Sequence, residues 1–205
     1  MSNPAPPALL ILGKGEIARC LAQLASTLGL SVTVSEPGAS EFPWPKGVEI
    51  RQVIYADAPW PLAPNTHAVI ARGHEADPQS VAALLNFSLP QSPQHSLHNI
   101  GAKQIYLIAS AKRAAEVIRV TTPLLIDIAA IEQLSAPAGL DLGGNSSMEI
   151  ALSILAEIQL RHYEKTGQAL THLREQRMHE QRLSEQGNPI NSSAEHKSIC
   201  PGKRV

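Results

Sequence analysis

The stretch LLILGKGEIARC, Leu9–Cys20, decides the fold class of this chain of 205 residues. Aliphatic residues run directly into Gly13-Lys14-Gly15, and a helical pattern begins at once. A continuous apolar run is typical of a strand that is buried on both faces. The stretch therefore predicts a buried strand, a tight turn and a helix, and such a turn fits either a bound phosphate or a connection that binds nothing.

The glycine turn has the spacing of a dinucleotide-binding fingerprint. Gly13, Gly15 and Ala18 form the pattern G-x-G-x-x-A. The first glycine allows the sharp turn, the second lets the backbone approach a pyrophosphate, and the small third residue lets the helix pack close to its strand. The N-terminus of the helix then faces the anion. The variable positions of the pattern, which we include in the predicted site, are Lys14, Glu16 and Ile17.

An acidic residue completes the fingerprint. Glu36 ends the β-branched run Ser31–Glu36 and follows Gly13 by about 20 positions, where a carboxylate binds ribose hydroxyls. A carboxylate repels a 2′-phosphate, so Glu36 favours NAD over NADP. The alternative is a vestigial turn that packs well and binds nothing.

Strand and helix patterns alternate along the chain. Apolar or β-branched runs predict strands at Ala8–Gly13, Ser31–Glu36, Val48–Tyr55, His67–Ala71 and Lys103–Ser110, with a short strand or extended piece at Ala136–Gly144. Helical spacing predicts helices over 15–30, 78–89, 111–120, 123–134 and 148–160. This alternation predicts an α/β fold, a doubly wound parallel sheet of the Rossmann-like class, over residues 8–160.

Local signals set helix starts and the ends of the domain. Asp77 before Pro78 predicts an N-cap, and Ser146 with Glu149 predicts a capping box. We expect residues 1–7 to be a flexible lead-in and 90–99 a surface loop. Residues 161–186 predict a charged helical extension and 187–205 a disordered tail. The histidines that we expect to be solvated in this polar end are His162, His172, His179 and His196.

Composition excludes several classes of protein. The net charge is -1 and aromatic residues make up 3% of the chain, which argues against nucleic-acid binding. No apolar run approaches the ~20 residues of a membrane span, and the N-terminus does not read as a signal peptide. The two cysteines have neither metal-ligand nor disulfide spacing. We expect a cytoplasmic protein without a membrane or nucleic-acid partner and without a bound metal ion.

Polar residues follow the predicted fourth strand, at the edge where α/β sheets bind ligands. Arg72, Gly73 and His74 come first. Arg72 fits pairing with a phosphate or carboxylate, and His74 fits a general base or a ligand. The alternative for both is hydrogen bonding within a loop.

Two further positions complete the predicted site. Ser110 ends the fifth strand and is followed by Lys112 and Arg113, which fit either an anionic group of a ligand or a solvated first helical turn. Asp141 lies between glycines, where a carboxylate either orients a ligand or caps the next helix.

Four segments, taken in order, resemble the Rossmann domain of the XdhC/CoxI family: LLILGKGEIARCLAQLASTLGLSVTVSE, VIARGHEAD, KQIYLIASAKRAAEVI and SAPAGLDLGGNSSMEIALSILAEI. The resemblance covers about residues 8–160. It implies a non-catalytic accessory factor for molybdenum hydroxylases such as xanthine dehydrogenase and CO dehydrogenase. Such factors are associated with binding molybdenum cofactor, helping it acquire its terminal sulfur and delivering it to the apo-enzyme.

The resemblance also implies ligands and partners. The expected cofactor is NAD, NADP or a related nucleotide, and molybdenum cofactor is a further candidate. The expected partners are a molybdenum hydroxylase, a cysteine desulfurase and a second copy of the chain in a homodimer.

The chain departs from the family pattern in three places. The family's preceding domain, with a cysteine motif near G-S-x-P-R, is not found. The stretch after the fifth strand reads Ala109-Ser110-Ala111-Lys112-Arg113, so a glycine is lost and the basic pair is shifted. The match is also weak between Arg119 and Ala136.

Two other functions stay open from the residues alone. A small NAD(P)-dependent oxidoreductase would need a proton donor near the nicotinamide, and His74 is the attractive donor. A nucleotide-sensing interaction module would use the basic C-terminal segment, residues 162–205, to dock a partner.

Overall fold

The computed structural model describes residues 4–73, 75–87 and 101–186. His74, the predicted surface loop and the predicted disordered tail lie outside the described residues. The chain divides into two units, Met1–Lys165 and Thr166–Val205. The first unit contains the sheet and every described residue of the predicted site.

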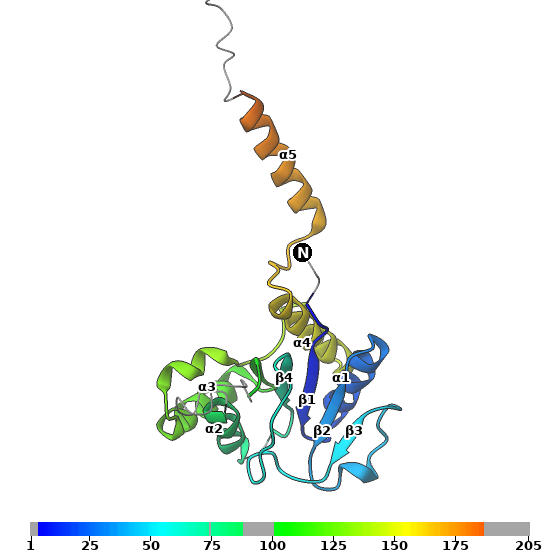
Figure 1. Cartoon of the computed structure of the whole chain (residues 1–205), viewed down its shortest axis with the longest axis vertical. Coiled ribbons are helices and arrows are strands. Elements are labelled where there is room, and N and C mark those ends of the chain that lie inside the picture. The colour runs from blue at the N-terminus through cyan, green and yellow to red at the C-terminus, as the bar shows by residue number, and fades with distance from the viewer. Residues whose placement is uncertain (1–3, 74, 88–100, 187–205) are drawn as a thin grey trace, which may run out of the picture. The chain divides into compact units, whose positions relative to one another are not determined.

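A six-stranded, all-parallel sheet confirms the predicted doubly wound fold (Figure 1). The strand order is β3-β2-β1-β4-β5-β6, so the order reverses between β1 and β4. The strands are β1 (Ala8–Leu12), β2 (Val32–Ser35), β3 (Glu49–Arg51), β4 (Thr66–Ile70), β5 (Gln104–Leu107) and β6 (Leu134–Ser135). Several strands are shorter than the runs that predicted them. The difference is largest for β3, which lies at the sheet edge and has only one neighbouring strand to pair with.

Successive residues of β1 serve two separate cores, which explains its continuous apolar sequence. Leu9 and Ile11 pack with α1 (Glu16–Thr27) and α4 (Ser147–His162). Leu10 and Leu12 pack with α2 (Asp77–Phe87) and α3 (Ala111–Thr121). Side chains of a strand alternate between faces, so only a strand buried on both sides needs an unbroken apolar run.

Capping groups fix where two of the helices begin. The predicted capping box at α4 is confirmed, because the Ser146 hydroxyl accepts from the Glu149 amide and the Glu149 carboxylate accepts from the Ser146 amide. Ser110 caps α3, where its hydroxyl accepts from the Arg113 amide at 3.3 Å. The structure therefore gives Ser110 a local role beside any ligand contact.

The predicted N-cap at Asp77 is wrong. Helix α2 begins at Asp77 itself, and the carboxylate Oδ2 lies 3.4 Å from Arg113 Nη2 instead of accepting from the first helical amides. The Asp77 side chain is 1% exposed, and its Oδ1 accepts no hydrogen bond from the part of the chain that the structure describes. Burial beside a cation draws this carboxylate away from the helix end.

The predicted helix over 123–134 is also wrong. Two 3₁₀ helices stand in its place, η2 (Thr122–Leu124) and η3 (Ile128–Gln133). Pro123 has no amide hydrogen, and Asp127 caps a new turn by accepting from the Ala129 amide at 3.0 Å. The sixth strand comes directly after η3 and ends just before residues 136–144, where we expected a short strand or an extended piece. Residues 136–144 themselves have no regular secondary structure.

A buried carboxylate holds this irregular segment against α4. Glu157 is 5% exposed and accepts from the Ser135 hydroxyl at 2.6 Å and the Gly139 amide at 2.7 Å. Arg161 Nε donates to the same carboxylate at 2.8 Å. The final glutamate of the family-like run SILAE therefore has a structural role.

A chain of hydrogen bonds at the amino-terminal end of the strands corrects the expectation that His162 is solvated. His162 is 5% exposed, and its Nε2 lies 2.8 Å from the Ala5 carbonyl oxygen. Its Nδ1 lies 3.2 Å from His67 Nε2, and His67 Nδ1 lies 3.1 Å from the Tyr106 hydroxyl. These distances make one continuous network through two imidazole rings.

The network has a single direction when both rings are neutral. A carbonyl only accepts, so His162 Nε2 donates to Ala5 and His162 Nδ1 is left to accept. His67 Nε2 then donates to it, and His67 Nδ1 accepts from Tyr106. Burial lowers the pKa of His67 to about 3, with His162 as the next cause, so this ring stays neutral near pH 7. The residues of the predicted lead-in nearest to β1 are thus tied to α4.

The second unit contains one described helix, α5 (Leu170–Gln186). The predicted charged helix from residue 161 is therefore two elements, because α4 continues to His162 and a non-helical stretch precedes α5. Apolar side chains of α5 such as Leu170 are exposed, at 82%. Within the described ranges, no helix is long and apolar enough to cross a membrane.

Candidate functional site

Gly13 makes the turn at the end of β1 possible. Its φ is +130°, a conformation that residues with a Cβ rarely adopt. A Cβ at this position would lie 2.7 Å from the carbonyl carbon and oxygen of Ala71, which follows β4. The first glycine of the fingerprint is therefore required by the close approach of two strand ends.

Gly15, unlike Gly13, is not required by the backbone conformation or by a close contact within the protein. It is the N-cap of α1 with φ -80° and ψ 178°, an ordinary extended conformation. A Cβ added here would meet nothing within 4 Å, and no side chain caps the helix among the described residues. The direction in which a side chain at position 15 would extend is therefore open, and the first amides of α1 have no side-chain cap, which are two conditions for binding a phosphate.

The residues around Gly15 divide between surface and core. Lys14 Nζ donates to the Pro37 carbonyl at 2.9 Å and so links the turn to the loop after β2. Glu16 pairs with Arg19 at 2.5 Å, and this guanidinium lowers the pKa of Glu16. Ile17 packs against the core, and Ala18 is fully buried. The small residue at the third position of the fingerprint is thus in contact with the core, as expected.

Glu36 and Arg72 form a buried ion pair. Arg72 Nε lies 2.9 Å from Glu36 Oε2, and the side chains are 4% and 13% exposed. Arg72 Nη1 also donates to the Ser80 hydroxyl at 3.4 Å. Arg72 therefore pairs with a carboxylate, as its residue type suggested, but the carboxylate belongs to the protein.

The ion pair joins two strands that are not neighbours. Glu36 follows β2 and Arg72 follows β4, and β1 lies between these strands in the sheet. The pair therefore spans the end of β1, next to the Gly13 turn, at the place where the strand order reverses. Doubly wound sheets bind their ligands at this switch point.

The other predicted site residues contribute less. Gly73 has φ +68°, which suits a glycine in the turn after Arg72. Asp141 is exposed and, as far as the described residues show, makes no hydrogen bond or ion pair. The structure therefore brings together Gly13, Lys14, Glu36 and Arg72, while it gives Asp141 no protein partner in this cluster.

Sequence reasoning missed Ser80 and the contact between Asp77 and Arg113. Both features link α2 to a neighbouring element near the Arg72 turn. A signal existed, because an apolar helix that carries Ser80 at a fully buried position must satisfy its hydroxyl. The described residues contain no group of three or more side chains arranged to hold a metal ion.

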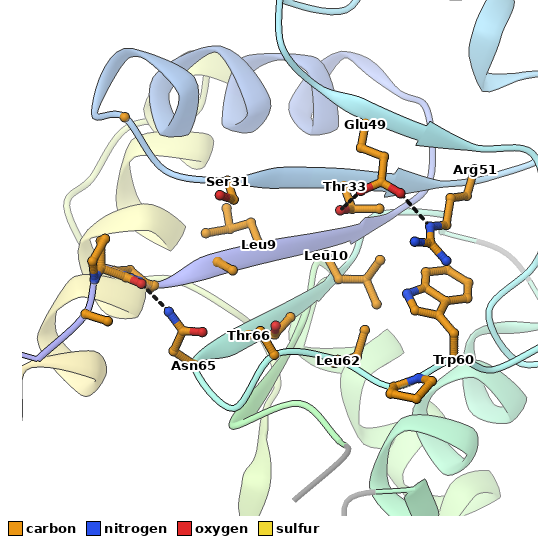
Figure 2. A pocket seen from close by; sticks show the side chains of 17 residues that line it. Leu9, Leu10, Ser31, Thr33, Glu49, Arg51, Trp60, Leu62, Asn65 and Thr66 are labelled. Atoms are coloured by element: carbon orange, nitrogen blue, oxygen red, sulfur yellow. Dashed lines mark hydrogen bonds and ion pairs between the residues drawn. The ribbon is translucent and has the colours of Figure 1, made fainter. Parts of the chain in front are cut away.

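A cavity lies at the amino-terminal part of β1, β2 and β4 (Figure 2). Its volume is about 470 Å³, and Leu10 and Leu62 line its apolar part. The Arg51 guanidinium lies 4.4 Å above the Trp60 ring centroid at one end, and Asn65, which donates to the Pro6 carbonyl, lies at the other. None of the predicted site residues lines this cavity, so it is distinct from the glycine turn.

The cluster at the glycine turn suits binding better than bond breaking. It offers open backbone amides for an anion and a fixed carboxylate for hydroxyl groups. Among its charged side chains, Glu36 and Arg72 neutralise each other, and the Lys14 ammonium group donates to the Pro37 carbonyl.

Comparisons with known proteins identify the family of the chain and support its fold. No curated protein matches the chain. A solved structure described as a xanthine dehydrogenase from Bacillus halodurans aligns with a TM-score of 0.57 at 20% identity, covering 78% of this chain and 44% of that one. The chain thus spans less than half of that protein, and the likeness supports the fold. The family described as XdhC Rossmann domain matches residues 9–158, so the chain belongs to the XdhC family.

Proposed function

We propose that the protein is an accessory factor for the maturation of a molybdenum hydroxylase and that it holds a nucleotide at the Gly13–Gly15 turn. The observation that carries the proposal is the open space at Gly15 before the uncapped α1, in a chain of the XdhC family. A helix N-terminus with free amides attracts phosphate, and the missing Cβ lets it come close.

The bound molecule combines a phosphate with a ribose. Glu36 stands beside the turn with one carboxylate oxygen turned to Arg72, and its Oε1 accepts no hydrogen bond from the described residues. This free oxygen suits ribose hydroxyls. The candidates are NAD, NADP and the nucleotide form of molybdenum cofactor.

Calorimetric titration tests the nucleotide site. Purified protein is titrated with NAD, NADP, AMP and a cytidine dinucleotide, and the same ligands are added to the Gly15→Asp and Gly15→Ala variants. We expect Gly15→Asp to weaken binding by about 100-fold or more, since its carboxylate fills the phosphate position. Gly15→Ala adds only a Cβ and gives a smaller loss. Equal affinities in the wild type and both variants would remove the glycine turn as the site.

The accessory role has its own test. A molybdenum hydroxylase is produced in cells that lack this protein, and its activity and sulfurated cofactor content are measured after complementation. We expect the wild type to restore both and Gly15→Asp to restore neither. Full hydroxylase activity without the protein would refute the accessory role, and turnover of NADH by the purified protein would support an oxidoreductase.

Partner contacts need apolar surface, and α4 supplies some. Met148 and Leu152 are one helical turn apart and are 44% and 50% exposed, and Leu142 before the helix is 56% exposed. This patch fits the hydroxylase, a cysteine desulfurase or a second copy of the chain. We expect Leu152→Lys to weaken co-purification with the hydroxylase without loss of nucleotide affinity, and light scattering shows whether the same change splits a homodimer.

A further inference from the structure

We propose that Arg72 is a positioning residue, which holds Glu36 so that the site selects a ribose with a free 2′-hydroxyl. This inference rests on the proposed function, because it concerns the same nucleotide site. Arg72 acts through Glu36 and does not touch the ligand itself.

Burial separates Arg72 from any ligand. Its side chain is 4% exposed, with Nε turned to Glu36 and Nη1 to Ser80. The Nε contact at 2.9 Å is an ion pair without hydrogen-bond geometry, and the Ser80 contact is long at 3.4 Å. Burial of the side chain and its attraction to Glu36 therefore keep Arg72 from reaching a phosphate. Glu36 is the more exposed partner, at 13%, and is therefore the side of the pair that a ligand reaches.

The Glu36–Arg72 pair differs from the other ion pairs of the described residues. Arg119 and Glu116 on α3 are 72% and 51% exposed, and Arg51 and Glu49 on β3 are 40% and 55% exposed. The remaining described pairs each contain a partner that is more than 30% exposed. Burial of two charges costs desolvation that their attraction barely offsets, so stability alone is a weak reason for this pair.

Geometry explains what the pair provides. The attraction between Arg72 and Oε2 at 2.9 Å restrains the carboxylate of Glu36, although Oε2 accepts no hydrogen bond from the described residues. Its other oxygen, Oε1, likewise accepts none from them and is the one that a ligand can use. A 2′-hydroxyl donates a hydrogen bond to that oxygen. A 2′-phosphate places a second anion against it, and the buried Arg72 does not move out to compensate.

Matched nucleotides isolate the ribose contact. The 5′-monophosphates of adenosine and cytidine are each compared with their 2′-deoxy forms, and adenosine 2′,5′-bisphosphate is added as the 2′-phosphate probe. A hydrogen bond from the hydroxyl to a carboxylate predicts that the wild type prefers the ribo form by about 10-fold or more. It also predicts that the bisphosphate binds more weakly than AMP.

Three variants then test Arg72. We expect Glu36→Gln and Arg72→Gln each to reduce the ribo-to-deoxy preference to between about one and two. The double variant should lose no more than either single variant, because the two residues form one unit. Arg119→Gln, which breaks the exposed pair on α3, is the matched control and should leave the preference unchanged.

A second substitution at Arg72 controls for destabilisation caused by removing a buried cation. Arg72→Lys keeps the charge and the fold but lacks the planar guanidinium, so we expect an intermediate preference. Circular dichroism and thermal unfolding check each variant. If Arg72→Gln does not fold, the Arg72→Lys result decides.

The outcomes separate the two proposals. Binding that Gly15→Asp abolishes, with a ribo-to-deoxy preference that stays at the wild-type value in folded Arg72→Gln or Arg72→Lys, overturns the role of Arg72 and leaves the nucleotide site intact. Losses that multiply in the double variant overturn it as well, since Arg72 would then contact the ligand independently. A wild type that binds none of these nucleotides refutes both proposals.

Discussion

The two ends of the parallel strands carry polar clusters of different kinds. At the carboxyl-terminal end, Glu36 and Arg72 form an ion pair near the open space at Gly15. At the amino-terminal end, Tyr106, His67 and His162 form a closed chain of hydrogen bonds, in which burial lowers the pKa of His67 and keeps that ring neutral.

The two clusters differ in how many of their hydrogen-bonding groups have a partner within the protein. The histidine chain uses all four ring nitrogens, and its last donor is taken by the Ala5 carbonyl. The glycine turn leaves helix amides uncapped and one carboxylate oxygen without a described partner. A cluster that satisfies itself stabilises the fold, whereas one with groups to spare is suited to a ligand. Changes at the amino-terminal end should therefore alter stability, and changes at the carboxyl-terminal end should alter binding.

The largest expected effect is the acid sensitivity that His67 creates. The unfolded chain takes up a proton near the ordinary pKa of 6.5, whereas the folded chain resists until about 3. The neutral His67 ring therefore contributes fully to the free energy of unfolding above pH 6.5. This contribution declines as the pH falls toward 3, by up to ~1.4 kcal/mol per pH unit, and about 3 kcal/mol is lost by pH 4. Urea unfolding of the wild type and His67→Gln from pH 7 to pH 4 measures it. Curves that stay parallel would show that His67 is not buried as a neutral ring.

The next effect separates the two glycines of the turn. Gly13→Ala should lower the free energy of unfolding by about 2–3 kcal/mol, because the new Cβ meets the Ala71 carbonyl and φ is +130°. Gly15→Ala should cost at most about 1 kcal/mol, since its φ is ordinary and the space is open. Urea unfolding at pH 7 compares both variants. Equal destabilisation would mean that Gly15 also faces protein.

A smaller effect tests the direction of the histidine chain. Tyr106→Phe removes the donor to His67 Nδ1 and leaves a buried acceptor unpaired. We expect a loss of about 1–2 kcal/mol in stability and no change in nucleotide affinity. Thermal unfolding and calorimetric titration of the same sample measure both. A change in nucleotide affinity of more than about 3-fold in Tyr106→Phe would show that the two ends of the strands are energetically coupled.

The smallest effect comes from an exposed pair that belongs to neither cluster. Arg119→Gln removes the 2.7 Å contact with Glu116 on the surface of α3. Exposed pairs are screened by water and salt, so we expect no loss of stability that unfolding experiments resolve. Unfolding in low and high salt checks this. A loss as large as that of Tyr106→Phe would show that this exposed ion pair stabilises the fold as much as a buried hydrogen bond does.

The fold and the glycine turn could be predicted because their signals are local. The run from Leu9 to Leu12 predicts a doubly buried strand, and the spacing from Gly13 to Ala18 fixes the turn and helix. The sequence-based predictions failed where contacts between distant residues determine the local structure. Asp77 reads as a cap until Arg113 is placed beside it, and Pro123 reads as a helix start although only 3₁₀ turns follow.

The polar clusters could be predicted only in part. The residue types of Glu36 and Arg72 indicated a site, but their contact joins positions far apart in the sequence, across β1. His162 lies at the start of a polar segment, and its burial depends on Ala5 and His67, which no periodicity links to it. A contact of this kind becomes visible only when the strand order is known.

We propose that the first amides of α1 bind the phosphate of a nucleotide. Amide proton and nitrogen chemical shifts of ¹⁵N-labelled protein are followed during titration with the tightest-binding nucleotide. We expect the largest, saturable shifts at Glu16, Ile17 and Ala18 and little change at His67, and we expect these shifts to disappear in Gly15→Asp. Saturable shifts confined to the cavity at Arg51 and Trp60, or none anywhere, would contradict it.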